Sequence, residues 1–208
     1  MSPIPDRPSV SWRARLGGCA VLFGVAITLS SCAAPTPEPV SPVTKWQAYR
    51  SGGGAFSMEA PADWAVSERG GAGGYETSFA ASRNNRIVVA QQMLPGGIEA
   101  RLLRDDTRDD ALISTVQAHY NMLERQFTSF HGDAPAPGTI INMFAASGGF
   151  TCQTKGGFMR PEAKLKGRTV VLIGLDNLYV IDAFGDAKSW GAVEPAFDHV
   201  VSTFKHQE

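Results

Sequence analysis

The sequence predicts an α+β domain, in which strands are combined with two helices. Short runs of alternating apolar and polar residues, such as Phe56–Ala60, are typical of half-buried strands. The long segment Thr107–Phe130 instead repeats its apolar residues every three or four positions, which is typical of an amphipathic helix. A second helical pattern, from about Glu194, closes the chain. Together these patterns indicate a single globular domain.

The first strands follow each other closely. Phe56–Ala60 ends at Pro61, which cannot donate a ladder hydrogen bond. The glycine run 70–74 is expected to be a hairpin turn or a mobile loop before a strand at Tyr75–Phe79. A phosphate-binding loop is less favoured because no Gly-Lys-Ser/Thr follows and no helix opens there. A third strand is expected at Arg86–Leu94.

The helix Thr107–Phe130 is the clearest element. Thr107 and Asp110 have the spacing of a capping box, and Asp109 and Asp110 suit the positive end of the helix dipole. One apolar face is expected to pack on a sheet. This face contains Ile113, Val116, Tyr120, Leu123, Phe127 and Phe130.

The second half of the domain is expected to be rich in strands. These are Thr139–Ala146, Gly149–Met159, Arg168–Leu175 and Leu178–Phe184. Asp176 and Asn177 are expected to form a tight hairpin turn between the last two. The closing helix is predicted to begin near Glu194, with Pro195 in its first turn. Its apolar stripe contains Val193, Phe197, Val200 or Val201, and Phe204.

The N-terminus reads as an export signal. Leu16–Leu29 is an uncharged stretch of 14 residues behind Arg13 and Arg15, too short to span a bilayer and suited to the apolar region of a secretory signal. Leu29-Ser30-Ser31-Cys32 follows and resembles the lipobox of bacterial lipoproteins. A second match, Leu16-Gly17-Gly18-Cys19, has no apolar run in front of it and is rejected. A plain secretory signal and an uncleaved anchor remain alternatives.

The lipoprotein resemblance implies that Cys32 is lipidated and that cleavage removes residues 1–31. Two or three acyl chains make such an anchor effectively permanent. Because Ala33 follows the cysteine in place of aspartate, the resemblance favours the outer membrane facing the periplasm, with the inner membrane left open. Residues 32–44 contain four prolines and are expected to form an extended tether outside the core. Residues 45–208 then form a single globular domain.

The charge and the cysteine content exclude some classes of function and structure. Cleavage removes three arginines and one aspartate, so the formal net charge changes from −1 to −3. A net charge of −3 is not typical of a protein that binds nucleic acid, and it does not indicate a polybasic patch that binds a membrane surface. Cys152 becomes the one cysteine besides Cys32, which excludes an internal disulfide framework. It is expected to be a buried small hydrophobe, with a reactive or intermolecular thiol as the alternative.

Two stretches of the domain carry a second resemblance. Ala55–Trp64 (AFSMEAPADW) is similar to the opening of PsbP-like domains, and Phe197–Phe204 (FDHVVSTF) is similar to their closing helix. The family includes photosystem extrinsic subunits and bacterial DcrB-type lipoproteins. The resemblance implies an α/β/α sandwich around a mainly antiparallel sheet, used mostly for protein interaction. Trp64 and Phe204 would be packing residues, and no catalytic role is implied.

No residue pattern indicates catalysis, a cofactor or a metal. The four histidines (His119, His131, His199 and His206) lack zinc-like spacing to one another or to cysteine. The acidic group Asp105, Asp106, Asp109 and Asp110 lacks calcium-loop spacing and suits a helix start. Ser147 is not in a nucleophile elbow. A site assembled from Cys152 and a distant histidine remains open.

These observations predict a membrane-anchored, periplasm-facing lipoprotein that is not an enzyme. It would act in the cell envelope as a protein-interaction module, with an envelope protein as partner, no nucleic acid and no cofactor. One alternative is an accessory protein that binds a small molecule or lipid for a transporter, which a deep apolar pocket would favour. The other is a hydrolase, which a nucleophile, a histidine and a carboxylate in one cleft would favour.

Overall fold

The computed structural model describes residues 39–71, 74–94, 107–157, 161–174 and 177–207. All of them belong to one compact unit, Thr36–Glu208. The predicted signal peptide 1–31 and the lipobox residues Leu29, Ser30, Ser31 and Cys32 lie outside the described residues. Asp105 and Asp106 of the acidic group also lie outside them.

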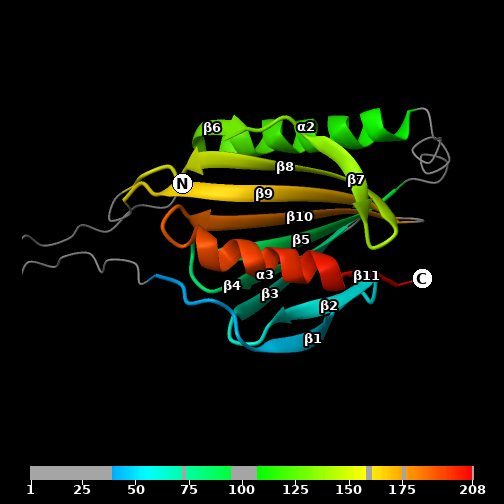
Figure 1. Cartoon of the computed structure of the whole chain (residues 1–208), viewed down its shortest axis with the longest axis horizontal. Helices are drawn as coiled ribbons and strands as arrows, with labels where there is room; N and C mark the ends of the chain where they lie inside the picture. Colours follow the sequence, from blue (N-terminus) through cyan, green and yellow to red (C-terminus); the bar gives the residue numbers. More distant parts are fainter. Residues whose placement is uncertain (1–38, 72–73, 95–106, 158–160, 175–176, 208) are drawn as a thin grey trace, which may run out of the picture. The chain divides into compact units, whose positions relative to one another are not determined.

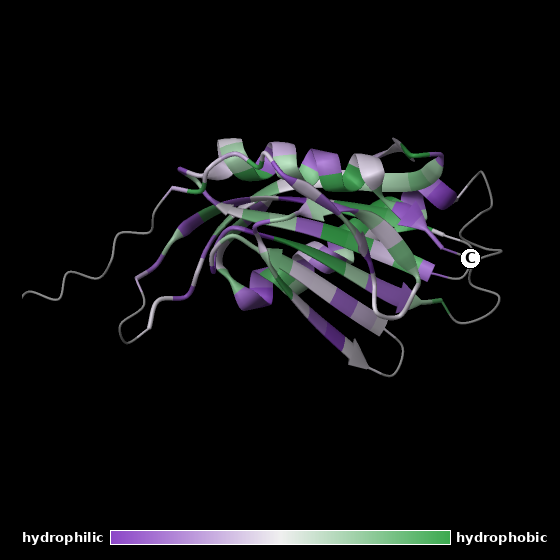
Figure 2. Cartoon of the chain, turned by 90° about the horizontal axis from the view of Figure 1, so that it is seen from below, coloured by the Kyte–Doolittle hydropathy of each residue, from purple (hydrophilic) through white to green (hydrophobic). Residues whose placement is uncertain are grey.

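The unit is built around a large antiparallel sheet (Figure 1). Seven of its strands follow the order β3-β4-β5-β10-β9-β8-β6, and β7 also pairs with β8. These strands are β3 (Ala65–Gly71), β4 (Gly74–Ala80), β5 (Arg86–Met93), β6 (Thr128–Gly132), β7 (Ala136–Ile140), β8 (Met143–Gln153), β9 (Lys164–Ile173) and β10 (Asn177–Asp186). In Figure 2 the inner strands carry long hydrophobic stretches.

A second, smaller antiparallel sheet has the order β1-β2-β11. Its strands are β1 (Trp46–Arg50), β2 (Phe56–Pro61) and β11 (Lys205–His206). This sheet joins the two ends of the domain, because β11 near the C-terminus pairs with β2 near the start of the domain. The strand predicted at Phe56–Ala60 is confirmed, since β2 covers these residues.

Two helices, α2 (Arg108–Gln126) and α3 (Trp190–Thr203), cover opposite faces of the large sheet. The evidence is the alternation of side chains along β10. Ile181 and Ala183 belong to the core on the α3 side, whereas Val180 and Phe184 contact the core on the α2 side. This arrangement confirms the predicted α+β class and α/β/α sandwich. Within the described ranges, no helix combines the length and the apolar character required to cross a membrane.

The aromatic residues near the two chain ends pack together on the α3 side. The rings of Phe56 and Phe204 are stacked with their centroids 5.5 Å apart, and Tyr179 meets Phe204 edge-on at 5.0 Å. Phe204 and Trp64 are both buried. Their predicted packing roles are confirmed, and the two stretches that carry the PsbP-like resemblance therefore meet in one core.

The helix predicted at Thr107–Phe130 ends earlier, because its last residues form a strand. Phe127 has extended backbone angles, and β6 then pairs with β8 through a register shift between Thr128 and His131. Ser129 in this bulge has φ 49°. Phe127 and Phe130 still contact the α2-side core. Pairing with β8 thus overrides the helical spacing of the apolar residues.

The strand predicted at Thr139–Ala146 is divided by a turn. Ile141 and Asn142 have φ 51° and 62°, the left-handed pair of a two-residue hairpin turn, and they connect β7 to β8. β8 then continues to Gln153, so the predicted strand from Gly149 to Met159 is confirmed only for Gly149–Gln153, as the second half of β8. Its end at Met159 lies outside the described residues. Isoleucine is unusual at positive φ, and the sequence therefore did not indicate this turn.

Both helix starts differ in detail from prediction. α3 begins at Trp190, four residues before Glu194, so Pro195 lies inside the helix and not in its first turn. Thr107 is the N-cap residue of α2, but its side chain makes no capping hydrogen bond, so the predicted capping box is not formed. Asp109 and Asp110 do lie in the first turn, as expected.

The tether was expected to stay outside the core, but its last part contacts the domain. Val40 and Val43 are partly buried and pack on the α3-side core. The Val40 amide also donates a hydrogen bond to Ser189 Oγ at 3.4 Å. Apolar burial of two valines explains why these residues lie on the domain despite the prolines around them.

Candidate functional site

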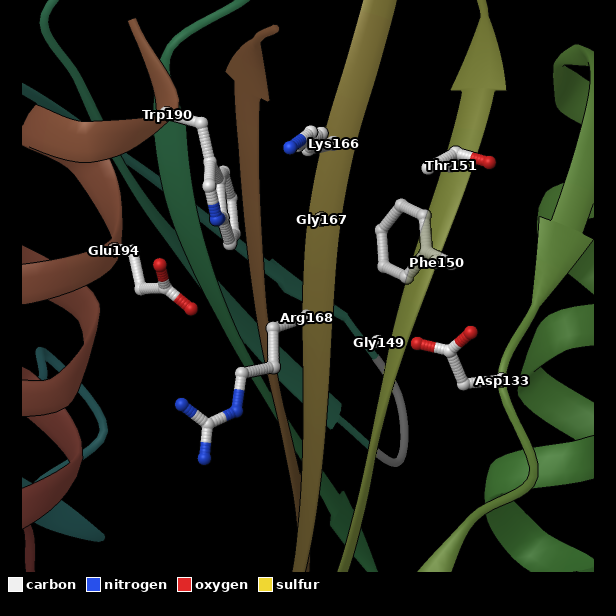
Figure 3. A pocket seen from close by; sticks show the side chains of 9 residues that line it. All are labelled: Asp133, Gly149, Phe150, Thr151, Lys166, Gly167, Arg168, Trp190 and Glu194. Carbon is white, nitrogen blue, oxygen red and sulfur yellow. The ribbon is translucent and has the colours of Figure 1, made fainter.

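A shallow groove lies between α3 and strands β8 and β9 (Figure 3). It has a volume of about 260 Å³. Its lining residues are Asp133, Gly149, Phe150, Thr151, Lys166, Gly167, Arg168, Trp190 and Glu194. Lys166 and Arg168 are two residues apart on β9, so both side chains point to the α3 face, as Figure 3 shows.

The groove carries two cations and two carboxylates. Arg168 is already engaged: its Nη1 lies 2.8 Å from Asp198 Oδ1, and its guanidinium carbon lies 5.7 Å from the ring centroid of Phe197. Lys166 is exposed. The groove is smaller, more open and more polar than a typical pocket for a small organic ligand. This groove therefore gives no support to the small-molecule alternative.

A buried polar network lies under α2 on the other face of the sheet. His119 Nε2 is 2.8 Å from Asp182 Oδ2, and the Thr169 hydroxyl donates to Asp182 Oδ1 at 2.7 Å. Burial lowers the pKa of His119, but the hydrogen bond and the charge of Asp182 outweigh it and hold this pKa above its ordinary value. The network therefore favours a charged imidazole beside a buried carboxylate.

This network is not arranged as a catalytic triad. Asp182 is central and accepts from both partners, whereas a triad requires the histidine between the carboxylate and the nucleophile. Cys152 is buried, and burial raises the pKa of its thiol to about 11. Ser147 lies within β8, away from any strand-to-helix turn. In the part of the chain that the structure describes, no three His, Cys, Asp or Glu side chains form a metal-binding group.

A second polar cluster connects the small sheet to β3 and β4. The hydroxyls of Tyr49 and Tyr75 each donate to the carboxylate of Glu68. Tyr49 also lies 3.0 Å from Thr77 Oγ1. These two donors hold the pKa of Glu68 below its ordinary value, with Tyr49 as the larger cause. The sequence analysis did not identify this cluster, because its members come from different strands and each residue type is common on a surface.

Strand β3 is an edge of the large sheet. Over the described residues it pairs only with β4, in regular register from Ala65 to Gly71, and every residue in it is exposed. Val66 is 42% exposed. The opposite edge differs, since β6 is interrupted by its bulge, and bulges protect edges against pairing. β3 is therefore the better candidate for pairing with another chain.

Comparisons with known proteins show which solved structures have a similar fold. No protein-family model and no curated protein matches the sequence. The solution structure of cyanobacterial PsbP (CyanoP) from Synechocystis is similar, with a TM-score of 0.51 and 15% identity over 83% of this chain and 98% of that chain. A crystal structure from Bacteroides thetaiotaomicron gives a TM-score of 0.51 and 11% identity over 79% of this chain; the match spans half (50%) of that protein.

LpqN of Mycobacterium tuberculosis, described as involved in cell envelope biogenesis, gives a TM-score of 0.46 and 10% identity over 79% of this chain and 91% of that chain. At such identities, similarity is informative about fold and not about activity. The antiparallel sheet, the helices on its two faces and the match to CyanoP agree, and the domain therefore has a PsbP-like fold.

Proposed function

We propose that this chain is a lipid-anchored accessory protein of the cell envelope that binds a protein partner and is not an enzyme. The lipobox-like sequence Leu29–Cys32 supplies the anchor, and the outer membrane facing the periplasm is the favoured location. The observation that carries the binding role is the exposed edge of β3. Its free amide and carbonyl groups suit the addition of a strand from a partner.

The side chains of β3 suit this role as well. Edge strands are often protected by inward-pointing charges. The charge of β3 that points toward the small sheet is Glu68, and its carboxylate is occupied by Tyr49 and Tyr75. It is thereby held against the domain and away from an approaching strand. Val66, which is exposed, offers an apolar contact.

The anchor is tested on the protein from intact cells. We expect mass spectrometry to find an acylated mature N-terminus at Cys32. We also expect metabolic palmitate labelling to disappear in Cys32→Ala and to persist in Cys19→Ala, since Cys19 belongs to the rejected match. Labelling that survives Cys32→Ala would exclude the anchor.

The binding edge is tested by photocrosslinking in intact cells. A photoreactive amino acid replaces Ser67 on β3, and a matched probe replaces Asn121, which is exposed on α2. We expect one discrete adduct, with the same envelope protein identified by mass spectrometry in repeated experiments, at Ser67 and none at Asn121. Equal adducts at both positions, or none at either, would contradict binding through β3.

A further inference from the structure

The turn between β4 and β5 shows how the backbone groups of these strands are directed. The Ala81 amide donates to the carbonyl of Asn85 at 3.0 Å, so these two residues form a hydrogen-bonded pair. They lie one position beyond the pair Ala80–Arg86. Hydrogen-bonded and non-hydrogen-bonded pairs alternate along an antiparallel ladder. Ala80 therefore makes no ladder bonds to β5 and directs its amide and carbonyl groups toward β3.

The turn between β9 and β10 leads to the same result independently. The Gly174 amide donates to the carbonyl of Asn177 at 2.8 Å, which makes them a hydrogen-bonded pair. Leu178, the next residue of β10, therefore directs its backbone groups toward β5, where it lies opposite Gln92. Alternation across β5 and β4 then again directs the backbone groups of Ala80 toward β3.

The same alternation shows which residues of β3 face its free edge. Ala80 lies opposite Ala65, and this pair and every second pair after it are joined by ladder hydrogen bonds. The residues between them, Val66, Glu68 and Gly70, direct their amide and carbonyl groups away from β4. The edge thus offers the backbone groups of three residues to a partner strand, with Glu68 in the middle.

The side chain of Glu68 lies on the face of the sheet that carries the small sheet. It lies opposite Thr77, and the Tyr49 hydroxyl contacts both side chains. The hydroxyls of Tyr49 and Tyr75 donate to the two carboxylate oxygens, and both phenols keep their protons at neutral pH. Over the described residues, no lysine or arginine forms an ion pair with Glu68. Neutral donors therefore hold this carboxylate in place.

This carboxylate remains able to bind a cation. The pKa of Glu68 lies below its ordinary value, chiefly because of the hydrogen bond from Tyr49, so the group is ionised at neutral pH. Each carboxylate oxygen can accept more than one hydrogen bond. Opposite residues of neighbouring strands point to the same face, with Cβ atoms about 4.5–5.5 Å apart. A long cationic side chain on a partner strand therefore reaches Glu68 without crossing the strand edge.

The other face of β3 has balanced charges. Arg69 lies directly opposite Glu76 on β4. Both side chains point away from the small sheet, because side chains alternate between the two faces of a strand. Glu68, in contrast, has the neutral Thr77 opposite it. The charge that a partner strand meets on the small-sheet face is therefore negative.

We propose that the strand bound by β3 carries a lysine or arginine directly opposite Glu68. This inference rests on the proposed binding through β3 and names the chemistry of that partner. An opposite charge at this position stabilises the strand pair, and a like charge destabilises it. A second copy of this chain is disfavoured for that reason. When Val66, Glu68 and Gly70 pair with the same three residues of a second copy, Glu68 lies opposite Glu68 of that copy.

The chemistry of the partner is tested by photocrosslinking in intact cells, with the full chain and the photoreactive residue at Ser67. Ser67 precedes Glu68 and points to the other face, so the probe leaves the carboxylate and its tyrosines unchanged. We expect the crosslinked partner residue, located by mass spectrometry, to have a lysine or arginine directly next to it. A partner residue without a basic neighbour, or an adduct between two copies of this chain, would overturn the proposal.

Variants of Glu68 test the charge itself. We expect the adduct yield to fall about two- to fivefold in Glu68→Gln and about tenfold or more in Glu68→Lys. Glu76→Gln is the matched control, because it removes the same charge from the neighbouring strand on the other face. It should leave the yield unchanged. Glutamine can still form hydrogen bonds with both tyrosines, and thermal unfolding checks that each variant is folded.

A charge exchange completes the test. Replacing the identified basic residue of the partner with glutamate should lower the yield, and combining this change with Glu68→Lys should restore it. Equal yields in the parent, Glu68→Gln and Glu68→Lys would overturn the proposed cation and leave binding through β3 intact. The absence of any adduct at Ser67 in the parent would contradict binding through β3, and the proposed cation with it.

Discussion

His119 on α2 and Asp182 on β10 connect the helical layer to the central strands, with Nε2 and Oδ2 2.8 Å apart. Both side chains are nearly buried, at 13% and 8% exposure. The contact joins residues that are 63 positions apart in the chain. A charged imidazole at this place stabilises the packing of α2 on the sheet, since an unpaired buried carboxylate is costly.

The pH dependence of stability should report this pair. The folded-state pKa of His119 is raised, so its contribution is complete below the unfolded value of about 6.5 and is lost as pH rises through the folded pKa. We expect the difference in unfolding free energy between the parent and His119→Gln to be larger at about pH 5.5 than at about pH 8.5. Urea titrations of both proteins at each pH measure it. A difference that grows with rising pH would contradict the charged pair.

Gly167 has no room for a side chain. A Cβ there would overlap the ring of Phe150 and lie 2.7 Å from the carbonyl oxygen of Ala183. We expect Gly167→Ala to lower the free energy of unfolding by about 1–3 kcal/mol through overpacking. Gly191→Ala is the control: nothing lies within 4 Å of its Cβ position in α3, so alanine should be neutral or stabilise the helix. Equal effects in thermal unfolding would contradict the crowded site.

Leu123 and its neighbour Met122 on α2 test which face of the helix is buried. Leu123 is 4% exposed in the core, and Met122 is 53% exposed. We expect Leu123→Asp to cost about 4 kcal/mol or more and to abolish the cooperative thermal transition, because it places a carboxylate in an apolar core. Met122→Asp should shift the midpoint by only a few degrees. A sharp transition near that of the parent in Leu123→Asp would place α2 outside the core.

The Cys152 thiol should not react in the folded protein. It is 3% exposed, and burial raises its pKa to about 11, so little thiolate is present at neutral pH. We expect N-ethylmaleimide to label the Cys152 peptide slowly in the native protein and rapidly in denaturant, as read by mass spectrometry. Rapid native labelling would revive the reactive-thiol alternative.

Sequence patterns predicted the elements with strong periodicity. β2, β4, β5 and most of α2 and α3 lie where alternation or helical spacing placed them, and Phe197 and Val200 face the core as expected. Boundaries were predicted less well. Phe127 and Phe130 fit the helical spacing, yet they leave the helix because β6 pairs with β8. A local stretch of sequence around Phe127 and Phe130 does not contain β8, so it cannot show that strand pairing will compete with the helix.

The weakly patterned strands escaped prediction for a similar reason. β1 and β3 have few buried residues of their own, so alternation is faint, and they become strands because neighbouring strands supply their hydrogen bonds. The contacts between polar side chains could not be predicted from the sequence either. Glu68 meets Tyr49 and Tyr75, and His119 meets Asp182, only after the sheet has formed.

The sequence by itself determined the α+β class, the PsbP-like resemblance and the predicted anchor, because local periodicity and a short linear motif carry that information. Only the tertiary structure decided which strand edge is free and how the chain enters the domain beside Ser189. Those properties depend on strand order and on contacts between distant residues, since folding brings side chains together that no local pattern relates.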